Sequence, residues 1–332
     1  MEQYMLVVSS ILISFILAAI VLPRWISKCK KIGLVWEDMN KFGHPKNAAS
    51  SGGIVVVMAF VLGVLFYVAI KTFVFAGSNF ALEIFSLLSV ILILGIIGLT
   101  DDLLGWHSKG LSIRIRLVLA FMSSIPLVVI NAGNHIVNIP IFGTVNFGIL
   151  YPLFLIPIGI AGASTTYNFL AGFNGLESGQ GILILSFLSF VAFTTGSPWL
   201  SIVGLCMVSA LVVFYFYNKF PAKVFPGNTL TYSVGALIAG MAILGNFEKI
   251  AVVVFIPYII EVFLKSRGGL EKHSFGVPDK KGKLSMPFRK IYGLEHLSIL
   301  ILNKFGKATE KKVTYLIFAF QIIFILIAFL ML

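Results

Sequence analysis

Two adjacent carboxylates at the end of a long apolar run are the residues in this sequence best suited to chemistry. Asp101 and Asp102 follow that run directly, and charges placed beside a membrane span are costly and tend to be functional. Like charges this close repel, and a divalent cation or a basic neighbour relieves the repulsion. The nearest basic residues are Lys109, Arg114 and Arg116. We predict a catalytic pair here, and a solvated helix end is the alternative.

A segment rich in glycine and asparagine follows further along the chain, at residues 168–180. Asn168 and Asn174 offer amide donors and acceptors, and Gly172 belongs to a set of glycines that let a ligand approach the backbone closely. Glu177 adds a carboxylate. Such a loop can read a nucleobase edge or hold a metal, and from spacing alone an ordinary Gly/Asn loop explains it equally well.

A third segment, residues 224–231, precedes another apolar run. Its Gly227, Asn228 and Thr229 are suited to begin a helix, with Asn228 or Thr229 as the N-cap. The free N–H groups of a helix start favour a phosphate. Capping alone needs no ligand, however, so both interpretations stay open.

A long basic loop, about residues 266–312, contains Lys272 and His273 together with Gly and Pro. Loops of this length are often binding segments, and a basic one suits a diphosphate. Membrane topology alone would explain its charges but not the histidine or the Gly/Pro punctuation. We expect the whole chain, 1–332, to be one membrane domain with this loop as part of its substrate site.

The composition shows what must position these clusters. The chain is 58% hydrophobic and only 11% charged, whereas soluble domains carry about 25% charged residues. Runs of about 20 apolar residues cross a bilayer as helices. We therefore predict an all-α, polytopic transmembrane bundle of about ten helices. The expected spans are 4–23, 52–71, 81–99, 115–131, 149–167, 180–196, 198–218, 229–245, 250–265 and 313–332.

The basic residues predict the orientation of this bundle. All Lys and Arg except Lys71 and Lys249 fall in or beside loops that share one side, and positive loops face the cytoplasm. Both termini are then outside, and all four clusters lie on the cytoplasmic face of the cell membrane. The net charge of +12 is spread over these loops, as expected for a bilayer partner, and we expect no nucleic acid.

In this order and spacing, the four clusters resemble the polyprenyl-phosphate N-acetylhexosamine-1-phosphate transferases. The resemblance spans nearly the whole chain. It is closest to the eukaryotic and archaeal branch that makes N-acetylglucosaminyl-diphospho-dolichol, the first lipid-linked sugar of N-glycosylation. Asp38, Asn40 and Lys41 match that branch's Asp-x-Asn-Lys segment. Residues 168–180 match its Asn/Gly loop, residues 224–229 its Val-Phe-x-Gly-Asp-Thr segment, and residues 282–284 its Gly-Lys-Leu.

The resemblance implies roles for the clusters. Mg²⁺, with Mn²⁺ as a substitute, would be held by Asn168 and Asn228, and Asn174 would read the uracil edge. Lys272 and His273 would contact the sugar phosphate. The substrates would be UDP-N-acetylglucosamine and a polyprenyl or dolichyl phosphate. The remaining expected substrate contacts are Asp38, Asn40, Lys41, Lys109, Arg114, Gly172 and Glu177.

Two positions depart from the family pattern. Asn228 stands where the family usually has an aspartate that binds Mg²⁺, and an uncharged amide should bind the ion more weakly. The family's basic triplet in the long loop is here Lys272, His273 and Ser274, which lacks one fork-shaped arginine clamp.

Other functions fit the sequence less well. A CDP-alcohol phosphatidyltransferase would carry an Asp-Gly-x-x-Ala-Arg signature, which the sequence lacks. A transporter for a lipid-linked solute often shows internal repeats and mid-membrane charges, whereas here the charges gather at one face. Other UDP-N-acetylhexosamine donors and a homodimer stay open.

Overall fold

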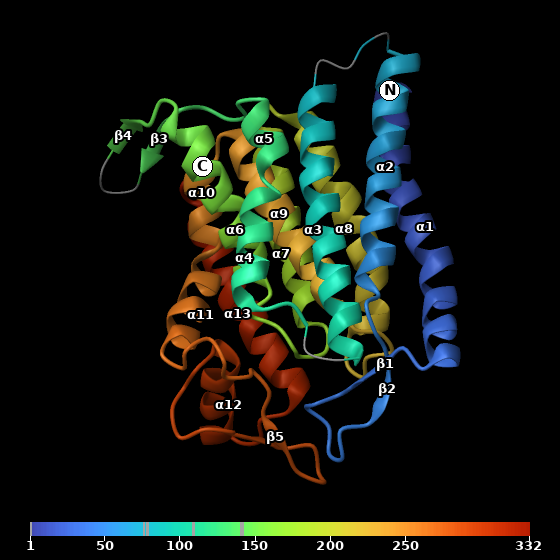
Figure 1. Ribbon diagram of the computed structural model, residues 1–332, viewed down its shortest axis with the longest axis vertical. Coiled ribbons are helices and arrows are strands. Elements are labelled where there is room, and N and C mark those ends of the chain that lie inside the picture. Colours follow the sequence, from blue (N-terminus) through green and yellow to red (C-terminus); the bar gives the residue numbers. More distant parts are fainter. Residues whose placement is uncertain (1, 76, 78–79, 108–109, 140–142) are drawn as a thin grey trace.

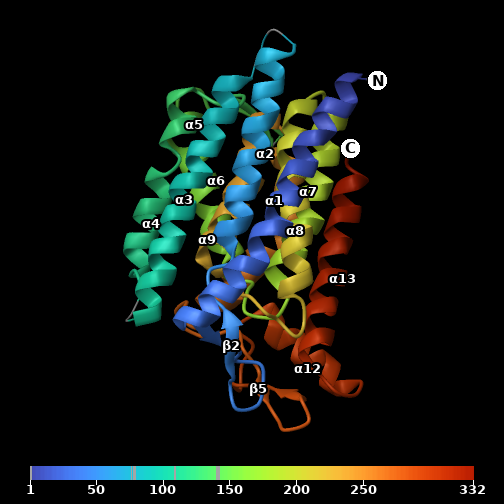
Figure 2. The ribbon, with the colours of Figure 1, turned by 90° about the vertical axis from the view of Figure 1, so that its right-hand side faces the viewer.

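The protein is a bundle of helices that run roughly along one axis, with a smaller loop region at one end (Figures 1 and 2). The computed structural model describes residues 2–75, 77, 80–107, 110–139 and 143–332. Short antiparallel hairpins are the sheet structure in this part of the chain. The predicted all-α, polytopic bundle is confirmed.

Seven helices among the described residues are long and apolar enough to cross a membrane. They are α1 (Glu2–Ile32), α2 (Gly53–Phe73), α3 (Ala81–His107), α7 (Leu176–Thr194), α8 (Pro198–Asn218), α9 (Gly227–Gly245) and α13 (Glu310–Phe329). Each overlaps one of the expected spans.

The other three expected spans, 115–131, 149–167 and 250–265, are helical but interrupted. They form α4 (Ile113–Met122) with α5 (Ile125–Val129), the π-helix η1 (Tyr151–Leu155) with α6 (Ile156–Tyr167), and α10 (Glu248–Val254) with α11 (Ile256–Ser266). Pro126, Pro157 and Pro257 lie in the first two positions of the second helix of each pair. Proline lacks an N–H and clashes inside a helix but is tolerated in its first turn, so each interruption coincides with a proline.

The central helix of the bundle is α9, which packs against α2, α3, α6 and α7. It is almost entirely buried. Gly235 lets it approach α6 closely, because a Cβ there would lie 2.5 Å from the carbonyl oxygen of Ala163. Small residues in these spans therefore serve close helix packing, as is common in membrane bundles.

The loop region lies at the end where α3 finishes and α9 begins (Figure 1). It contains the hairpin of β1 (Val35–Glu37) and β2 (Lys46–Ala49), and a second hairpin of β5 (Val277–Pro278) and β6 (Leu284–Ser285). It also contains α12 (Leu294–Lys304), which packs on α11 and α13. The third hairpin, β3 (Ile136–Ile139) and β4 (Gly143–Asn146), lies at the opposite end (Figure 1).

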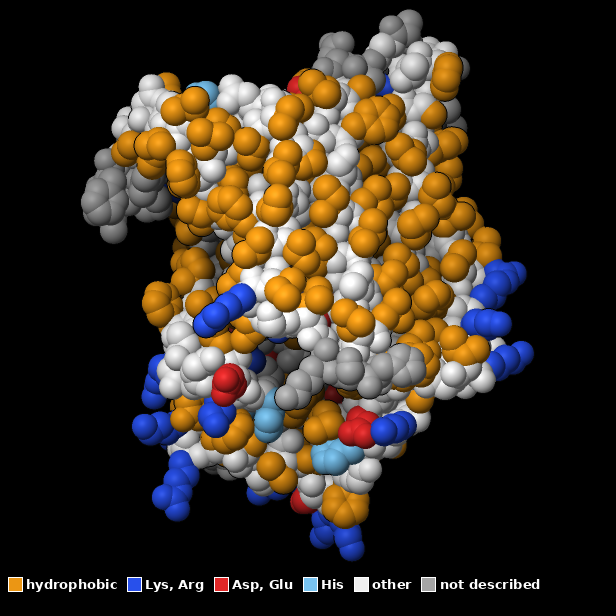
Figure 3. All heavy atoms as spheres, in the orientation of Figure 1, with side chains coloured by type: hydrophobic (Ala, Val, Ile, Leu, Met, Phe, Trp, Pro, Cys, Tyr) orange, Lys and Arg blue, Asp and Glu red, His pale blue; other side chains and the backbone are white. Residues whose placement is uncertain are grey.

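Both termini lie at the same end of the bundle, opposite the loop region (Figures 1 and 2). Figure 3 shows the Lys and Arg side chains of that face gathered around the loop region, below a belt of apolar side chains. This arrangement agrees with the charge pattern in the sequence. Which end faces the cytoplasm stays a prediction.

Candidate active site

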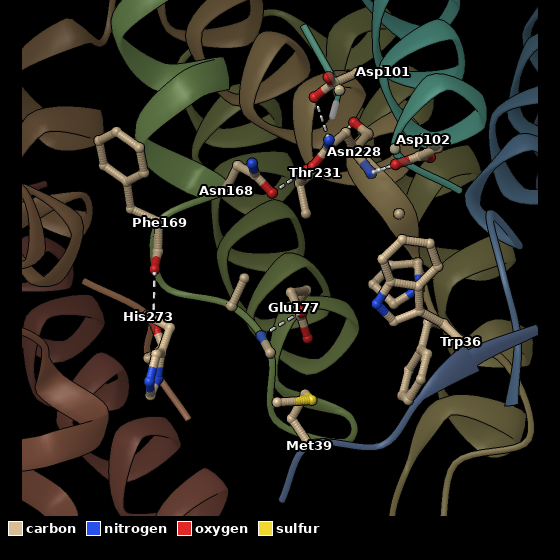
Figure 4. A pocket seen from close by; sticks show the side chains of 18 of the residues that line it. Trp36, Met39, Asp101, Asp102, Asn168, Phe169, Glu177, Asn228, Thr231 and His273 are labelled. Atoms are coloured by element: carbon tan, nitrogen blue, oxygen red, sulfur yellow. Dashed lines mark hydrogen bonds between the residues drawn. The ribbon is translucent and has the colours of Figure 1, made fainter. Parts of the chain in front are cut away.

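A pocket of about 540 Å³ opens at the loop end of the bundle. Its wall combines the end of α3, the loop before α7, the start of α9, the β1 hairpin and the long loop after α11 (Figure 4). Segments far apart in the sequence therefore meet around one space. The expected site residues that line it are Asp38, Asp101, Asp102, Asn168, Gly172, Glu177, Asn228 and His273.

Asp101 is buried at the pocket edge and its carboxylate is held from three directions. Oδ1 accepts the backbone N–H of Leu111 at 2.5 Å. Oδ2 accepts the Asn228 side-chain amide at 2.6 Å and lies 3.3 Å from the Arg116 guanidinium. Asp101 is thus an oriented anion whose neighbouring cation is Arg116.

Asp102, at the end of α3, forms hydrogen bonds with the first residues of α9. Its Oδ1 accepts the backbone N–H of Asn228 at 2.7 Å, and its Oδ2 accepts the Thr229 hydroxyl at 3.0 Å and the Thr229 N–H at 3.3 Å. A carboxylate at a helix N-terminus satisfies unpaired N–H groups and interacts favourably with the helix dipole. The prediction that Asn228 or Thr229 is the N-cap is wrong, because α9 already begins at Gly227 after Pro226 and the carboxylate that meets its first N–H groups comes from α3. Asp102 occupies the N–H groups that the sequence suggested for a phosphate.

This cross-helix cap needs an unusually close approach of α3 and α9. A Cβ at Gly98 would lie 2.6 Å from the backbone of Asn228, so a side chain there would push the two helices apart. Gly227 has φ +69° and faces the Asp102 carboxylate. These two glycines bring the aspartate pair and Asn228 together.

Asn168 and Asn228, the expected metal ligands, both face the pocket (Figure 4). Asn168 Oδ1 accepts the Thr231 hydroxyl at 3.0 Å. The Asn228 amide nitrogen is engaged by Asp101, so its oxygen is the group that remains for coordination. Thr231 lies one helical turn from Asn228 and joins the two asparagines into one group.

Several expected substrate contacts instead hold the pocket wall together from behind. Asn40 donates to the carbonyl of Gly172 at 2.9 Å and accepts from the N–H of Gly276 at 3.1 Å, so it joins three loops. Asn174 donates to Asp38 Oδ2 at 3.1 Å. Lys41 pairs with the same oxygen at 2.5 Å. Asn40, Lys41 and Asn174 are not among the described residues that line the pocket.

The loop before α7 is shaped by Glu177, which is buried. Its Oε1 accepts the N–H of Gly172 at 2.8 Å, closing the turn back on the helix start (Figure 4). Gly172 itself has φ +100°, a conformation that strongly favours glycine. Its Cβ position is also filled by the ring of Phe275 at 2.7 Å. The glycine that was expected to admit a ligand therefore also admits the long loop.

The long loop brings His273 to the pocket opposite the aspartate pair (Figure 4). Burial lowers the pKa of His273, and the positive charge of Lys265 lowers it further. The imidazole is therefore neutral at neutral pH and can donate or accept a hydrogen bond. Lys272 instead lies 5.4 Å from the centre of the Phe288 ring and does not line the pocket.

Basic residues near the aspartate pair differ from the expectation in one respect. Arg114 is exposed on α4 and does not line the pocket, whereas Arg116 does. Residues two apart on a helix point in different directions, so only one of them can face Asp101. Lys109 lies outside the described residues.

Sequence reasoning missed Lys265 and Trp36 as pocket residues. Lys265 ends an apolar span and resembles an ordinary topology signal. Trp36 is not part of a recognisable sequence motif. Its position in β1 brings it to the pocket.

Comparison with known proteins shows the family to which this chain belongs. Residues 84–246 match the family described as glycosyl transferase family 4. A Saccharolobus solfataricus protein, provisionally named a UDP-N-acetylglucosamine–dolichyl-phosphate N-acetylglucosaminephosphotransferase, is 33% identical over 96% of this chain and 94% of its own. The chain belongs to glycosyl transferase family 4. It is an enzyme that moves a sugar 1-phosphate onto a polyprenyl phosphate.

Two further relatives show how far the similarity extends. A Dictyostelium discoideum UDP-N-acetylglucosamine–dolichyl-phosphate N-acetylglucosaminephosphotransferase is 29% identical over 72% of this chain and 66% of its own. A phospho-N-acetylmuramoyl-pentapeptide-transferase of Streptococcus thermophilus is 29% identical over 75% of both chains. Both relatives carry sugar-phosphate transferase names but different donors, so family 4 membership alone leaves the donor open.

The pocket of this family 4 transferase offers a donor set that fits magnesium. Mg²⁺ takes oxygen ligands and is usually bound by one or two carboxylates together with substrate phosphates. Asp101 and Asp102 supply carboxylate oxygens, and Asn168 and Asn228 supply amide oxygens, in one pocket. Within this set of four side chains, the negative charge comes from the α3 pair, because both asparagines are neutral.

Proposed function

We propose that this enzyme transfers N-acetylglucosamine 1-phosphate from UDP-N-acetylglucosamine to dolichyl phosphate or a similar polyprenyl phosphate, releasing UMP. This would be the first step of lipid-linked oligosaccharide synthesis for N-glycosylation, at the cytoplasmic face of the cell membrane. The observation that carries the proposal is the similarity over 96% of the chain to a relative with that name. The pocket supports it, since carboxylates, amides and a basic loop meet there.

The reaction depends more on positioning of the two phosphates than on general acid–base catalysis. An oxygen of the carrier phosphate attacks the β-phosphorus of the donor, and the bond between that phosphorus and the UMP oxygen breaks. A phosphate monoester has a second pKa of about 6, so the nucleophile is largely ionised at neutral pH. Orientation and charge neutralisation then dominate such a transfer.

The aspartate pair divides these tasks. Asp101 orients the reacting phosphates through its fixed carboxylate and its Arg116 partner. Asp102 also faces the pocket, but its hydrogen bonds to the start of α9 make it a positioning residue for Asn228. Direct displacement needs no further nucleophile from the protein.

Mg²⁺ would be held by Asn168 and Asn228 with the carboxylates of the pair, and it would neutralise charge on the diphosphate. The remaining contacts belong to the loops. In this proposal His273 donates to the sugar phosphate, and Gly172, whose N–H and carbonyl are bonded to Glu177 and Asn40, shapes the loop beside it. Asp38 keeps the wall behind Gly172 in place through Asn174.

The test is UMP release by purified protein supplied with UDP-N-acetylglucosamine, dolichyl phosphate and Mg²⁺. We expect UMP that depends on both the lipid and the metal. Asp101→Asn should lower the turnover at least about a hundredfold, because the pocket loses its oriented charge. Reactions without lipid, and with UDP-N-acetylgalactosamine as donor, are the controls. If no UDP-N-acetylhexosamine gives UMP with any polyprenyl phosphate, the proposed function is wrong.

A further inference from the structure

Lys265, at the end of α11, is a buried cation in the pocket wall. Its side chain is 9% exposed, and it lines the pocket next to His273 and Ser274. Lysine is almost never this buried unless it is paired. Among the described residues that line the pocket, the lysine and arginine side chains are those of Lys265 and Arg116. They come from different sides, since Arg116 accompanies the aspartate pair and Lys265 accompanies the long loop.

The contacts of Lys265 leave part of its hydrogen-bonding capacity unused. An ammonium group carries three donors. One points to the Ser274 hydroxyl at 2.6 Å. The nearest Glu261 oxygen is 3.6 Å away, which is an ion pair but too long for a hydrogen bond. A ligand in the pocket can therefore receive a donor from Lys265 without breaking these contacts.

Two buried carboxyl groups lie behind Lys265. Glu261 and Glu295 are both 0% exposed, and their oxygens converge on Gly293, at 2.8 and 2.6 Å from its Cβ position. Glu261 also accepts the N–H of Leu294 at 2.7 Å and so begins α12. Glu261 Oε1 lies 3.6 Å from the Lys265 ammonium, so the buried cation has an acidic neighbour on the side away from the pocket.

Ser274 connects the same ammonium to the loop before α7. Its hydroxyl lies 3.5 Å from the carbonyl oxygen of Phe169, next to Asn168 (Figure 4). The cation is therefore held by α11, the long loop and the loop before α7 together. Such a preorganised charge costs little to place when a ligand arrives.

We propose that Lys265 binds the β-phosphate of the UDP-sugar, the phosphate that carries the sugar. The inference rests on the proposed function. It means that the phosphate is bound, on the side of the pocket formed by the long loop, by Lys265 of α11. Glu261 and Ser274 hold the ammonium in place, and His273 lies beside it. Lys265 then neutralises charge on the transferred group, while Arg116 serves the aspartate pair.

Comparing the affinities for UDP and UMP distinguishes binding of the β-phosphate by Lys265 from a purely structural role of Lys265, because the two nucleotides differ by the β-phosphate alone. Their affinities are measured by calorimetry on the detergent-solubilised protein with Mg²⁺. We expect Lys265→Met to weaken UDP binding at least about tenfold, the value of one lost hydrogen bond between charged groups. UMP binding should change less than about threefold. Lys265→Arg should retain most of the preference for UDP.

Lys265→Met leaves Glu261 without its cation, so the double variant Lys265→Met/Glu261→Gln is measured beside it. The double variant removes both charges and should show the same selective loss for UDP. Lys290→Met is the matched control, since Lys290 belongs to the same loop but is exposed and away from the pocket.

Equal weakening of UDP and UMP in both variants would show that Lys265 only supports the wall, which overturns the inference. Unchanged UDP affinity would overturn it as well. Both results leave the proposed function standing, because the unaltered protein still binds the nucleotides. If the unaltered protein binds neither UDP nor UMP, the proposed function and this inference fail together.

Discussion

At the scale of single residues, the site depends on which groups contact the two aspartates. Asp101 and Asp102 are adjacent in sequence, yet one carboxylate meets Arg116 and the Asn228 side chain while the other meets the backbone of α9. Asn228 therefore contacts both aspartates. Its amide nitrogen suits this position because it donates to Asp101, which a carboxylate in its place could not do.

Replacing this amide by a carboxylate tests its role in metal binding. Asn228→Asp adds a charged oxygen ligand, so the Mg²⁺ concentration for half-maximal activity should fall several-fold. Without metal, the new carboxylate faces Asp101 and should lower the thermal unfolding midpoint. Activity is titrated with Mg²⁺ and unfolding is followed with and without chelator. Asn134→Asp, at the opposite end, is the control, and an unchanged Mg²⁺ requirement would contradict a metal role for residue 228.

At the scale of elements, helix ends do most of the positioning. The end of α3 caps the start of α9, and Glu261 of α11 caps the start of α12. In both cases a carboxylate from one helix satisfies the N–H groups of another. Such caps contribute about 1 kcal/mol each. They also fix the angle between two elements that line the same pocket.

The start of α12 carries a pH-sensitive residue, His296, which is 0% exposed. Burial and, to a smaller extent, the positive charge of Lys265 together lower the pKa of His296 to about 4. The unfolded chain takes up a proton near pH 6.5, whereas the folded protein does not until about pH 4. The stability from His296 is therefore complete above pH 6.5 and is lost as the pH falls toward 4, by at most about 3 kcal/mol.

His296→Gln should make the unfolding midpoint less sensitive to pH between 6.5 and 4. Its amide oxygen can still accept the Tyr292 N–H that Nδ1 now accepts at 3.3 Å. Thermal unfolding in detergent across this range measures the difference from the unaltered protein, with His135→Gln at the far end as the control. Parallel curves for the unaltered protein and His296→Gln would refute the prediction.

At the scale of the whole molecule, the bundle is polarised. The pocket and most basic side chains lie at one end, and both termini lie at the other (Figures 1 and 3). A one-sided site of this kind suits a water-soluble nucleotide and a lipid phosphate at the membrane surface. The basic end should also attract both anionic substrates and anionic headgroups.

Orientation in the membrane is tested with single cysteines. In a Cys29→Ser/Cys206→Ser background, Lys290→Cys should react with a membrane-impermeant maleimide only in inside-out vesicles. Thr72→Cys, at the opposite end of α2, should react only in right-side-out vesicles or cells. Both predictions follow from the positive-inside rule. The reverse pattern would place the pocket outside the cell.

Sequence alone determined the membrane class, the helical segments and which segments meet at the pocket. Those properties follow from local composition, since a long apolar run has to bury its backbone polar groups in a helix. The prolines at 126, 157 and 257 are visible in the sequence as well. Because a hydropathy average over about 20 residues is insensitive to single prolines, three spans were expected to be continuous. Their interruption is a local effect that the average conceals.

Tertiary structure decided which side chains face the pocket. Arg116 rather than Arg114 meets Asp101 because of the rotation of α4, and Asn40 and Asn174 turn toward other loops because partners lie there. Lys265 lines the pocket from the end of α11, a helix that packs beside α12. Such directions depend on contacts between residues up to 236 positions apart. No local pattern encodes them, because each partner is supplied by the packing of the whole bundle.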